Sequence, residues 1–409
     1  MVLVASCGRA QSPVSSVVHR DSAGIQIVES SRPMWSEDSV WTLSAEPVLR
    51  IGVVEGDSPY LFSNVEGALL RPDGGLIVAD RGSSEIRYFD KTGAHEFSVG
   101  RPGEGPGEFG YIRSLGRCGA DSLFVFEIDH QFKVFTADGV YVRQARPYDT
   151  QTVDRRPYAL RCADTGYFVA VGWEPRVASG RPSGAPSEIG FYRAEAPVWI
   201  LGPNHLVGPG LATIDHAQLT IATDIGTFLS SERIGSATGS RPHPFGRSLH
   251  LGVSRGGILL GTGESAEMRQ YSYDGVLQKV IRWPVPDLTI GAEDIAAYRA
   301  AQLEMVSEDR RPALERSLAE MPMPPALPAY TRIELDADGS IWVSEFSKPS
   351  RPAANWLVFN RSGELLGRVR VPVDLEITHI GSDHLVGIER DDLGVERIVV
   401  YNIRKLSSG

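Results

Sequence analysis

Residues 62–93 read FSNVEGALLRPDGGLIVADRGSSEIRYFDKTG, and residues 109–139 read FGYIRSLGRCGADSLFVFEIDHQFKVFTADG. When Phe62 is placed over Phe109 and a gap of one residue is allowed, the final glycines coincide, so the unit recurs after about 46 residues. Each unit contains a turn, an apolar strand that ends in an acid, a polar loop and a second strand with an aromatic residue. A repeat of this length, built from short strands, is typical of β-propeller blades.

Related strand-and-turn units occur in four further places along the chain. Their apolar strands and glycine turns, such as SYDG and NRSG, follow the same order as in the first two units. The predicted blade cores are 65–98, 109–145, 157–230, 243–282, 328–370 and 375–405. We therefore expect an all-β fold, a six-bladed β-propeller that occupies residues 21–409 as one domain. We also expect the strand at 24–29 to complete the last blade and close the ring.

The stretch VGRPGEGPGEFG at residues 99–110 contains the G-x-G-x-x-G spacing of dinucleotide-binding loops. Such a loop opens a helix, whereas an apolar, β-rich segment follows this one. Glu104 and Glu108 would also repel a phosphate. The stretch is therefore predicted to connect the outer strand of one blade to the inner strand of the next.

Residues 71–109, RPDGGLIVADRGSSEIRYFDKTGAHEFSVGRPGEGPGEF, resemble the NHL-type repeat. The resemblance is strong over about 50–145, fair over 328–402 and poor over 175–245. It implies a six-bladed propeller like those of bacterial cell-envelope lipoproteins, most of which have no assigned activity. NHL-type propellers include RNA binders, an amidating lyase and protein-binding modules, so the resemblance implies the fold and leaves the function open.

Two segments depart from the repeat. Residues 174–188 are rich in Gly, Pro and Ser and are predicted to be a surface loop. Residues 287–325 interrupt the propeller with two predicted helices, with Pro312 at a helix start and Pro322 just past a helix end. This helical insertion is either a lid or partner surface, or a packed insertion without a role of its own.

The composition excludes some classes of protein. The chain of 409 residues is 42% hydrophobic and carries a formal net charge of −10, without a long basic run. This balance argues against a nucleic-acid partner. No apolar run reaches the length of a membrane-spanning helix.

The N-terminus resembles a bacterial lipobox at Val4-Ala5-Ser6-Cys7, followed by a polar, Ser-rich stretch. Residues 1–20 are therefore predicted to be a truncated lipoprotein signal and tether, with Cys7 as the lipidated residue and membrane anchor. The alternative is a frayed N-terminus. The prediction places the protein outside the cytoplasm, in the periplasm or tethered to the outer membrane.

Four acids fall at one position of the repeat, at or near the end of the first clear strand of each unit. These strand-end acids are Asp80, Glu127, Glu345 and Glu389. Equivalent positions in a propeller lie on a ring, so the acids could crowd around the mouth of the channel and bind Ca²⁺ or a cationic ligand. The alternative is that each accepts local backbone N–H bonds and pairs with a neighbouring arginine, Arg81 or Arg390.

Cys118 and Cys162 occupy similar places in successive units, 44 residues apart. In an oxidising envelope they could form a disulfide. Packed sheets lie about 10 Å apart and a disulfide needs Cα atoms within about 7 Å, which leaves two buried thiols as the alternative.

No catalytic motif is readable. The sequence contains no G-x-S-x-G, H-E-x-x-H or C-x-x-C pattern. Lactonase-type propellers use Glu, Asn and Asp around a divalent ion; Glu66, Asn204 and Asp336 are available here but sit in no matching motif. Among the histidines, His243 in RPHPFGR deserves inspection.

The leading hypothesis is a non-catalytic binding module, monomeric and without a cofactor, for a protein, peptide or glycan. The alternative is a metal-dependent hydrolase or lyase of the lactonase or amidating-lyase type, with a cation such as Ca²⁺ at the central channel.

Overall fold

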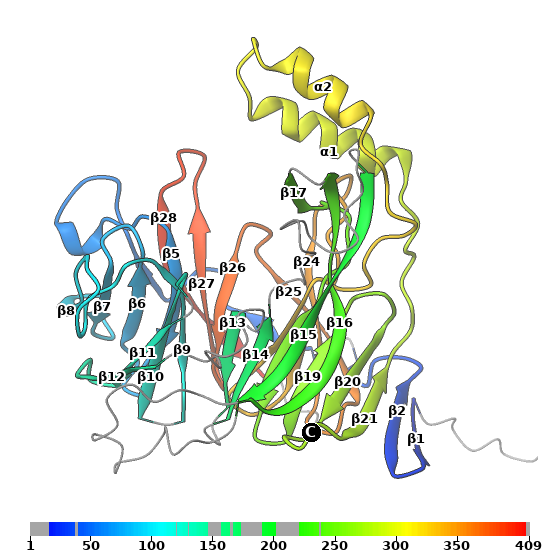
Figure 1. The fold of residues 1–409 in the computed structure, drawn as a ribbon, viewed down its shortest axis with the longest axis horizontal. Coiled ribbons are helices and arrows are strands. Elements are labelled where there is room, and N and C mark those ends of the chain that lie inside the picture. Colours follow the sequence, from blue (N-terminus) through cyan, green and yellow to red (C-terminus); the bar gives the residue numbers. More distant parts are fainter. Residues whose placement is uncertain are drawn as a thin grey trace, which may run out of the picture.

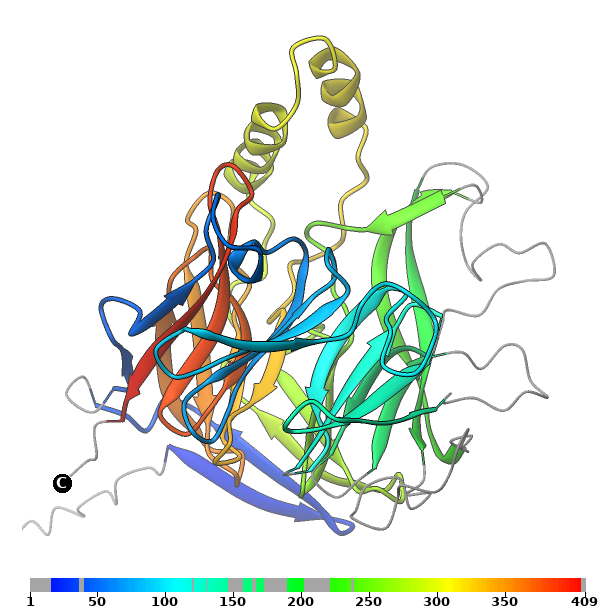
Figure 2. The same cartoon turned by 90° about the vertical axis from the view of Figure 1, so that its left-hand side faces the viewer.

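The protein is mostly β and has a β-propeller architecture (Figure 1). This computed structural model describes residues 16–36, 40–119, 121–129, 131–145, 157–163, 167–172, 190–201, 221–236 and 239–405. In this part of the chain most strands follow one another as antiparallel neighbours, so that each sheet is a local meander. The sheets stand side by side around the middle of the molecule (Figure 2).

The sheets are built from consecutive stretches of sequence. One contains β5 (Val65–Leu70), β6 (Leu76–Asp80), β7 (Glu85–Phe89) and β8 (His95–Val99). The next contains β9 (Ile112–Arg117), β10 (Ser122–Glu127), β11 (Phe132–Thr136) and β12 (Tyr141–Ala145). A third contains β13 (Pro157–Cys162), β14 (Phe168–Gly172), β15 (Gly190–Leu201), β16 (Ile221–Ser236) and β17 (Gly239–Pro242).

The second half of the chain continues the pattern. One sheet contains β18 (His250–Ser254), β19 (Gly257–Gly261), β20 (Glu267–Tyr271) and β21 (Leu277–Arg282). Another contains β22 (Arg332–Leu335), β23 (Ile341–Ser344), β24 (Ala354–Phe359) and β25 (Leu365–Val371). The last contains β26 (Glu376–Ile380), β27 (His384–Arg390) and β28 (Glu396–Arg404).

The N-terminal strands complete two different sheets. β28 pairs with β4 (Leu49–Ile51) and β3 (Thr42–Leu43), so the last sheet is finished by residues from the start of the chain. The strand expected to do this, β2 (Ile25–Ser30), instead runs parallel to β21 and carries β1 (Val17–Ser22) on its outer side. The prediction for residues 24–29 was therefore wrong. Ile25–Ser30 and Leu49–Ile51 are both short and partly apolar. Their periodicity therefore does not show which of them pairs with β28 and which with β21.

The core consists of apolar layers between neighbouring sheets. Ile77 and Ala79 of β6 pack with Leu123 and Val125 of β10 in one buried cluster. These strands are apolar on both faces, as expected for strands covered by a sheet on each side. The packing explains why the repeat is visible in the sequence.

Residues 99–110 connect two sheets. The Phe109 N–H donates to Arg101 O at 2.8 Å, and Gly103 N–H donates back to Phe109 O at 3.1 Å, which closes a compact loop. Phe109 is fully buried between the sheets. Gly100 has φ +96°, and a Cβ there would lie 2.4 Å from the Phe109 ring, so only glycine fits. The loop joins β8 to β9, as its sequence predicts.

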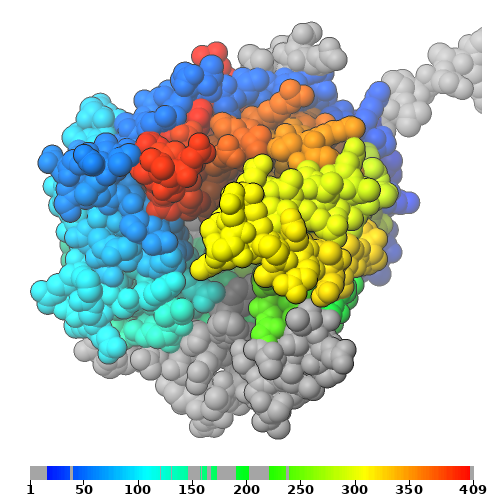
Figure 3. Space-filling model, turned by 90° about the horizontal axis from the view of Figure 1, so that it is seen from above, coloured from blue at the N-terminus to red at the C-terminus, as the bar shows by residue number. Residues whose placement is uncertain are grey.

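A helical hairpin, residues 287–325, rises from the top of the molecule between β21 and β22 (Figure 1). It contains α1 (Ala292–Glu304) and α2 (Arg311–Ala319). Seen from above, it extends from one side towards the middle of the upper face (Figure 3). No helix in the described part of the chain is both long and apolar enough to span a bilayer.

Candidate functional site

A central cavity of about 480 Å³ lies where the sheets meet. Its wall includes residues of β5, β9, β13, β22 and β26, each the edge strand of its sheet. A side chamber of about 160 Å³, lined by residues of β13, β18 and β22, extends the space towards another sheet. The volume of the central cavity lies in the range of small-ligand sites, and its wall mixes apolar with charged side chains.

The edge strands that line the cavity are the inner strands of their sheets. One group of charged side chains lies near the beginnings of these inner strands. Glu66 of β5 interacts electrostatically with Glu376 of β26 and with Arg113 of β9. Burial raises the pKa of Glu66, and Arg81 Nη1, 2.5 Å from Glu66 Oε1, acts in the opposite direction. This end of the cavity therefore contains both carboxylate and guanidinium groups.

A second group lies at or near the ends of the inner strands. We call Arg117 of β9, Arg161 of β13 and His379 of β26 the arginine end of the cavity. Burial, together with the positive charge of Arg117, lowers the pKa of His379 to about 4. The His379 ring is therefore neutral at neutral pH, and the charge of the arginine end comes from its two guanidinium groups.

The acids on the cavity wall have cationic partners. Arg390 Nη1 lies 2.6 Å from Glu376 Oε2. Arg332 Nε lies 2.7 Å from Glu334 Oε1, and both residues belong to β22. Together with the Arg81–Glu66 pair, these contacts compensate the negative charge of each glutamate on the wall.

Two of the strand-end acids, Asp80 and Glu127, are buried in their own sheets. Asp80 accepts hydrogen bonds from the N–H groups of Ser63 and Gly82, and its Oδ2 lies 3.0 Å from Arg87 Nη2. Glu127 accepts a bond from the Gly110 N–H at 2.7 Å and pairs with Lys133. Burial raises the pKa of both carboxyl groups, while the cationic partner favours the ionised form.

The other two strand-end acids are also engaged locally. Glu345 makes a two-point contact with Arg368, at 2.7 and 2.8 Å. Glu389 pairs with Arg50 at 2.9 Å and accepts a bond from the Tyr401 hydroxyl.

The strand-end acids thus do not converge on one point. Among the described residues, no group of three or more His, Cys, Asp or Glu side chains could hold a metal ion. The oxygens of the four acids already accept bonds from backbone amides, hydroxyls and cations, so this donor set does not fit a Ca²⁺ centre. Arg81 and Arg390, the arginines expected beside these acids, instead reach Glu66 and Glu376 on the cavity wall.

Cys118 and Cys162 are joined by a disulfide, with Cα atoms 5.2 Å apart. The bond links the end of β9 to the end of β13, across two sheets. The 10 Å spacing between sheet faces does not apply there, because inner strands converge towards the axis of a propeller. Cys118 is buried against Phe124, Phe126 and Trp199.

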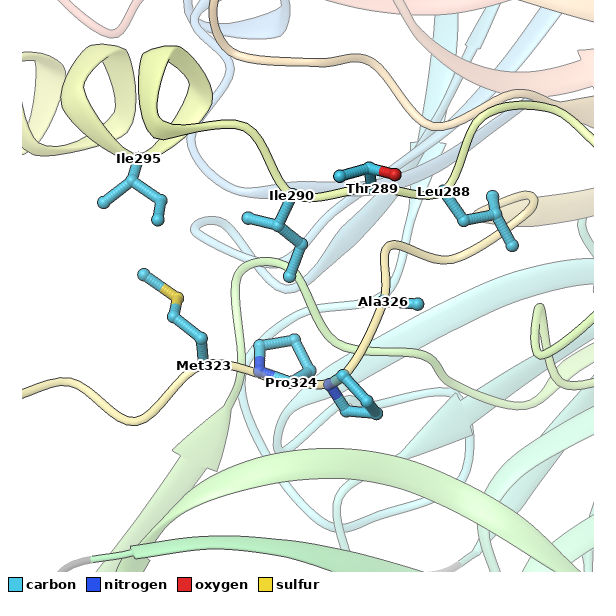
Figure 4. Close-up of a pocket in the computed structure, with 8 residues that line it drawn as sticks. Leu288, Thr289, Ile290, Ile295, Met323, Pro324 and Ala326 are labelled. Carbon is cyan, nitrogen blue, oxygen red and sulfur yellow. The ribbon is translucent and has the colours of Figure 1, made fainter.

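A second, more apolar pocket of about 510 Å³ lies between the two legs of the helical hairpin (Figure 4). Leu288 and Ile290 come from the ascending leg, Ile295 from α1, and Met323 and Pro324 from the returning leg. The legs are fixed to the propeller below, where Phe245 and Ile234 pack with Leu327 and Met321. The two legs that line the pocket are therefore fixed in place by the propeller.

His243 ties the returning leg to the propeller. The Phe245 N–H donates to His243 Nδ1 at 3.0 Å, so the ring proton is on Nε2, which donates to Pro322 O at 2.9 Å. Burial lowers the pKa of His243, which favours this neutral form. The histidine singled out in the sequence is thus a structural anchor of the helical hairpin.

The charged side chains of the cavity wall were missed in the sequence, apart from Glu66. They belong to the first strand of each unit, which lies just before the apolar strand used for alignment. A signal was present, because these short strands carry Arg or Glu between apolar residues, as in IRSLGR and RIEL. Asp336, considered for a metal set, is buried and accepts bonds from the Ser340 N–H and the Trp342 indole. Cys7, Asn204 and the loop 174–188 lie outside the described residues.

No family model matches the chain. No curated protein matches it either.

Solved structures of similar shape exist. An exported protein from Bacteroides fragilis aligns with 93% of this chain and 100% of its own, at 12% identity and a TM-score of 0.46. A calcium-binding protein, regucalcin, from Agrobacterium tumefaciens aligns with 88% of this chain and 95% of its own, at 11% identity and a TM-score of 0.40. A luciferin-regenerating enzyme aligns with 89% and 96%, at 10% identity and a TM-score of 0.42. The names of the last two proteins describe different functions, and the likeness is one of overall shape.

Proposed function

We propose that the protein is a non-catalytic binding module that acts outside the cytoplasm and takes a protein, peptide or glycan segment into its central cavity. In this proposal each sheet is one blade of a six-bladed propeller of the NHL-like kind. The chain works as a monomer without a cofactor, and Cys7 anchors it to the membrane.

The observation that carries the proposal is the wall of the central cavity. Edge strands from different sheets bring apolar residues such as Leu115 and Ile377 together with charged ones such as Arg113 and Glu376. A wall of this kind suits a ligand that has both apolar and polar groups. The strand-end acids, which would have to provide a catalytic cation site, are occupied in ion pairs within their sheets.

The helical hairpin adds a second contact surface above the cavity. It extends towards the middle of the upper face, and Met305 at the end of α1 is 80% exposed. A ligand larger than the cavity, such as an extended peptide or an oligosaccharide, would contact both the cavity wall and the helical hairpin.

Obstruction of the cavity tests the proposal. Ser114 of β9 lies on the cavity wall, so Ser114→Trp would fill part of the space. Val140→Trp is the matched control, because Val140 is 62% exposed, in the connection between β11 and β12. Arrays of peptides and oligosaccharides would be screened with the full chain and both variants, after melting curves confirm that all three are folded.

We expect a ligand class that binds the wild-type and the Val140→Trp protein and loses most of its affinity for Ser114→Trp. Equal binding by both variants would contradict the proposal. Metal analysis of the purified protein addresses the alternative: a stoichiometric divalent ion, together with lactone or ester hydrolysis that a chelator abolishes, would favour the metal-dependent hydrolase.

A further inference from the structure

Arg117 and Arg161 are held near each other by a covalent bond. Arg117 is the last residue of β9 and Arg161 the next-to-last residue of β13, and the cysteines that follow them form the Cys118–Cys162 disulfide. The link therefore lies one residue away from each arginine. Both arginines line the central cavity.

The local backbone explains why Arg117 faces the cavity. Successive side chains of a strand point to opposite faces. Cys118 lies in the apolar core between the sheets, with only 1% of its surface exposed. Arg117, the residue before it, consequently points to the other side, where its Nη2 donates to Leu70 O at 2.5 Å.

The two guanidinium groups are unusual in an acidic protein. The chain has a formal net charge of −10, yet its central cavity holds two arginines beside a buried, neutral His379. The glutamates of the wall are engaged with Arg81, Arg390 and Arg332. Two positively charged side chains on one cavity wall attract an anion that enters the cavity.

We propose that the arginine end of the cavity, formed by Arg117, Arg161 and His379, binds an oxyanion group of the ligand, a carboxylate, sulfate or phosphate. Guanidinium groups bind such groups through two parallel N–H···O bonds, which gives both affinity and orientation. His379 supplies a further polar contact. The disulfide holds the two arginines in place before the ligand arrives. This inference rests on the proposed function, because it names the chemistry of the ligand that enters the same cavity.

The experiment uses simple anions as probes. Sodium sulfate, sodium phosphate and sodium citrate would be titrated into the full chain by calorimetry, with sodium chloride at equal ionic strength as the reference. We expect saturable binding of at least one oxyanion. The affinities for sulfate, phosphate and citrate would show whether the natural ligand carries a sulfate, a phosphate or a carboxylate group.

Arg161→Gln is the main test variant, because Arg161 lies at the cavity with an exposed side chain and its replacement should leave the fold intact. Arg117→Gln is the second variant. We expect each to weaken oxyanion binding about tenfold or more. Arg370→Gln is the matched control, since Arg370 is an exposed arginine of β25 outside the cavity, and it should bind like the wild type.

The disulfide provides an independent test of the inference. The double variant Cys118→Ser/Cys162→Ser keeps both arginines but removes the link, and we expect it to weaken oxyanion binding several-fold while it remains folded. Unchanged binding in Arg161→Gln, an equal loss in Arg370→Gln, or no oxyanion binding by the wild type would overturn the inference. A peptide or neutral glycan that Ser114→Trp excludes and Arg161→Gln retains would preserve the proposed function and refute only the oxyanion site.

Discussion

Lys133 Nζ lies 2.7 Å from Glu127 Oε2, and the two side chains are 0% and 2% exposed. Arg87 and Asp80 form the corresponding pair in the preceding sheet, at 3.0 Å. In both sheets the acid ends one strand and the cation lies on the next, so the pair closes the polar end of an otherwise apolar blade core. These acids are thus engaged within their own blades.

The first prediction concerns this buried pair. Lys133→Met should lower the free energy of unfolding by about 3–5 kcal/mol, because it leaves the Glu127 carboxylate buried without its partner. The double variant Glu127→Gln/Lys133→Met should lose clearly less than the sum of the single variants. Urea denaturation would measure all of these values. Arg101→Met, which breaks the exposed pair with Glu108, is the control and should cost at most about 1 kcal/mol. Additive losses in the double variant would contradict the ion-pair explanation.

A second prediction concerns the disulfide. Removal of the Cys118–Cys162 bond should lower the free energy of unfolding by about 2–4 kcal/mol, since it frees a segment of 44 residues in the unfolded chain. Melting curves with and without a thiol reductant would show the change. The Cys118→Ser/Cys162→Ser variant should melt at the temperature of the reduced wild type, and it should not respond to the reductant. A reductant effect that persists in this variant would show that the stabilisation has another source.

The third prediction concerns pH. His379 and His250 both line the cavity space, and burial lowers the pKa of each to about 4. Arg117 faces His379 and Arg332 faces His250, and both charges act in the same direction as burial. Above about pH 7.5 both rings are largely neutral in the folded and the unfolded chain. As the pH falls from 6.5 to 4, only the unfolded chain takes up the protons, so stability should fall.

The free energy of unfolding should fall by at most about 1.4 kcal/mol per pH unit for each histidine. Urea denaturation at pH 7.0, 6.0 and 5.0 would measure it. His379→Gln should flatten the curve between pH 6.5 and 5. His95→Gln, which changes a histidine of the outer strand β8, should leave the curve unchanged. An identical slope in the wild type and His379→Gln would mean that other groups cause the acid sensitivity.

The fourth prediction concerns the anchor of the helical hairpin. His243→Ala removes the bond to Pro322 O and leaves the Phe245 N–H without its acceptor, a local cost of about 1–3 kcal/mol. Trypsin should therefore cut the helical hairpin after Arg310 about tenfold faster or more, with a smaller change in global melting. His250→Ala is the control, because His250 is a half-buried histidine whose described contacts, with Ser248 and Tyr330, lie outside the helical hairpin. Faster cleavage in both variants would indicate general destabilisation.

The sequence predicts the β-propeller architecture because residues 62–139 hold two consecutive units whose strands are apolar on both faces. The long strands β15 and β16 were not recognised as a pair, because the third unit matches the repeat poorly. The closing strand was misassigned because Leu49–Ile51 and Ile25–Ser30 have similar apolar character, and only the three-dimensional path of the chain separates them.

The candidate site was less predictable. The alignment drew attention to Asp80 and Glu127 because they recur in the repeat, and their local partners Arg87 and Lys133 lie on the following strand. The cavity wall has no shared motif, since each inner strand contributes different charged residues. The closeness of Arg117 to Arg161 depends on how two sheets meet at the axis, which no periodicity within a single strand reveals.

The pairing of β28 with β4 has a consequence for biosynthesis. β4 leaves the ribosome long before its partner β28, because β5 to β27 lie between the two strands in the chain. The entropy of closing so long a loop grows only slowly with its length, but contacts between distant residues form slowly. Until β28 emerges, the nascent chain presents the backbone of β4 as an unpaired edge, open to other unfinished chains. Chaperones that shelter this edge during translation should therefore matter more for the yield of the protein than for the stability of the finished ring.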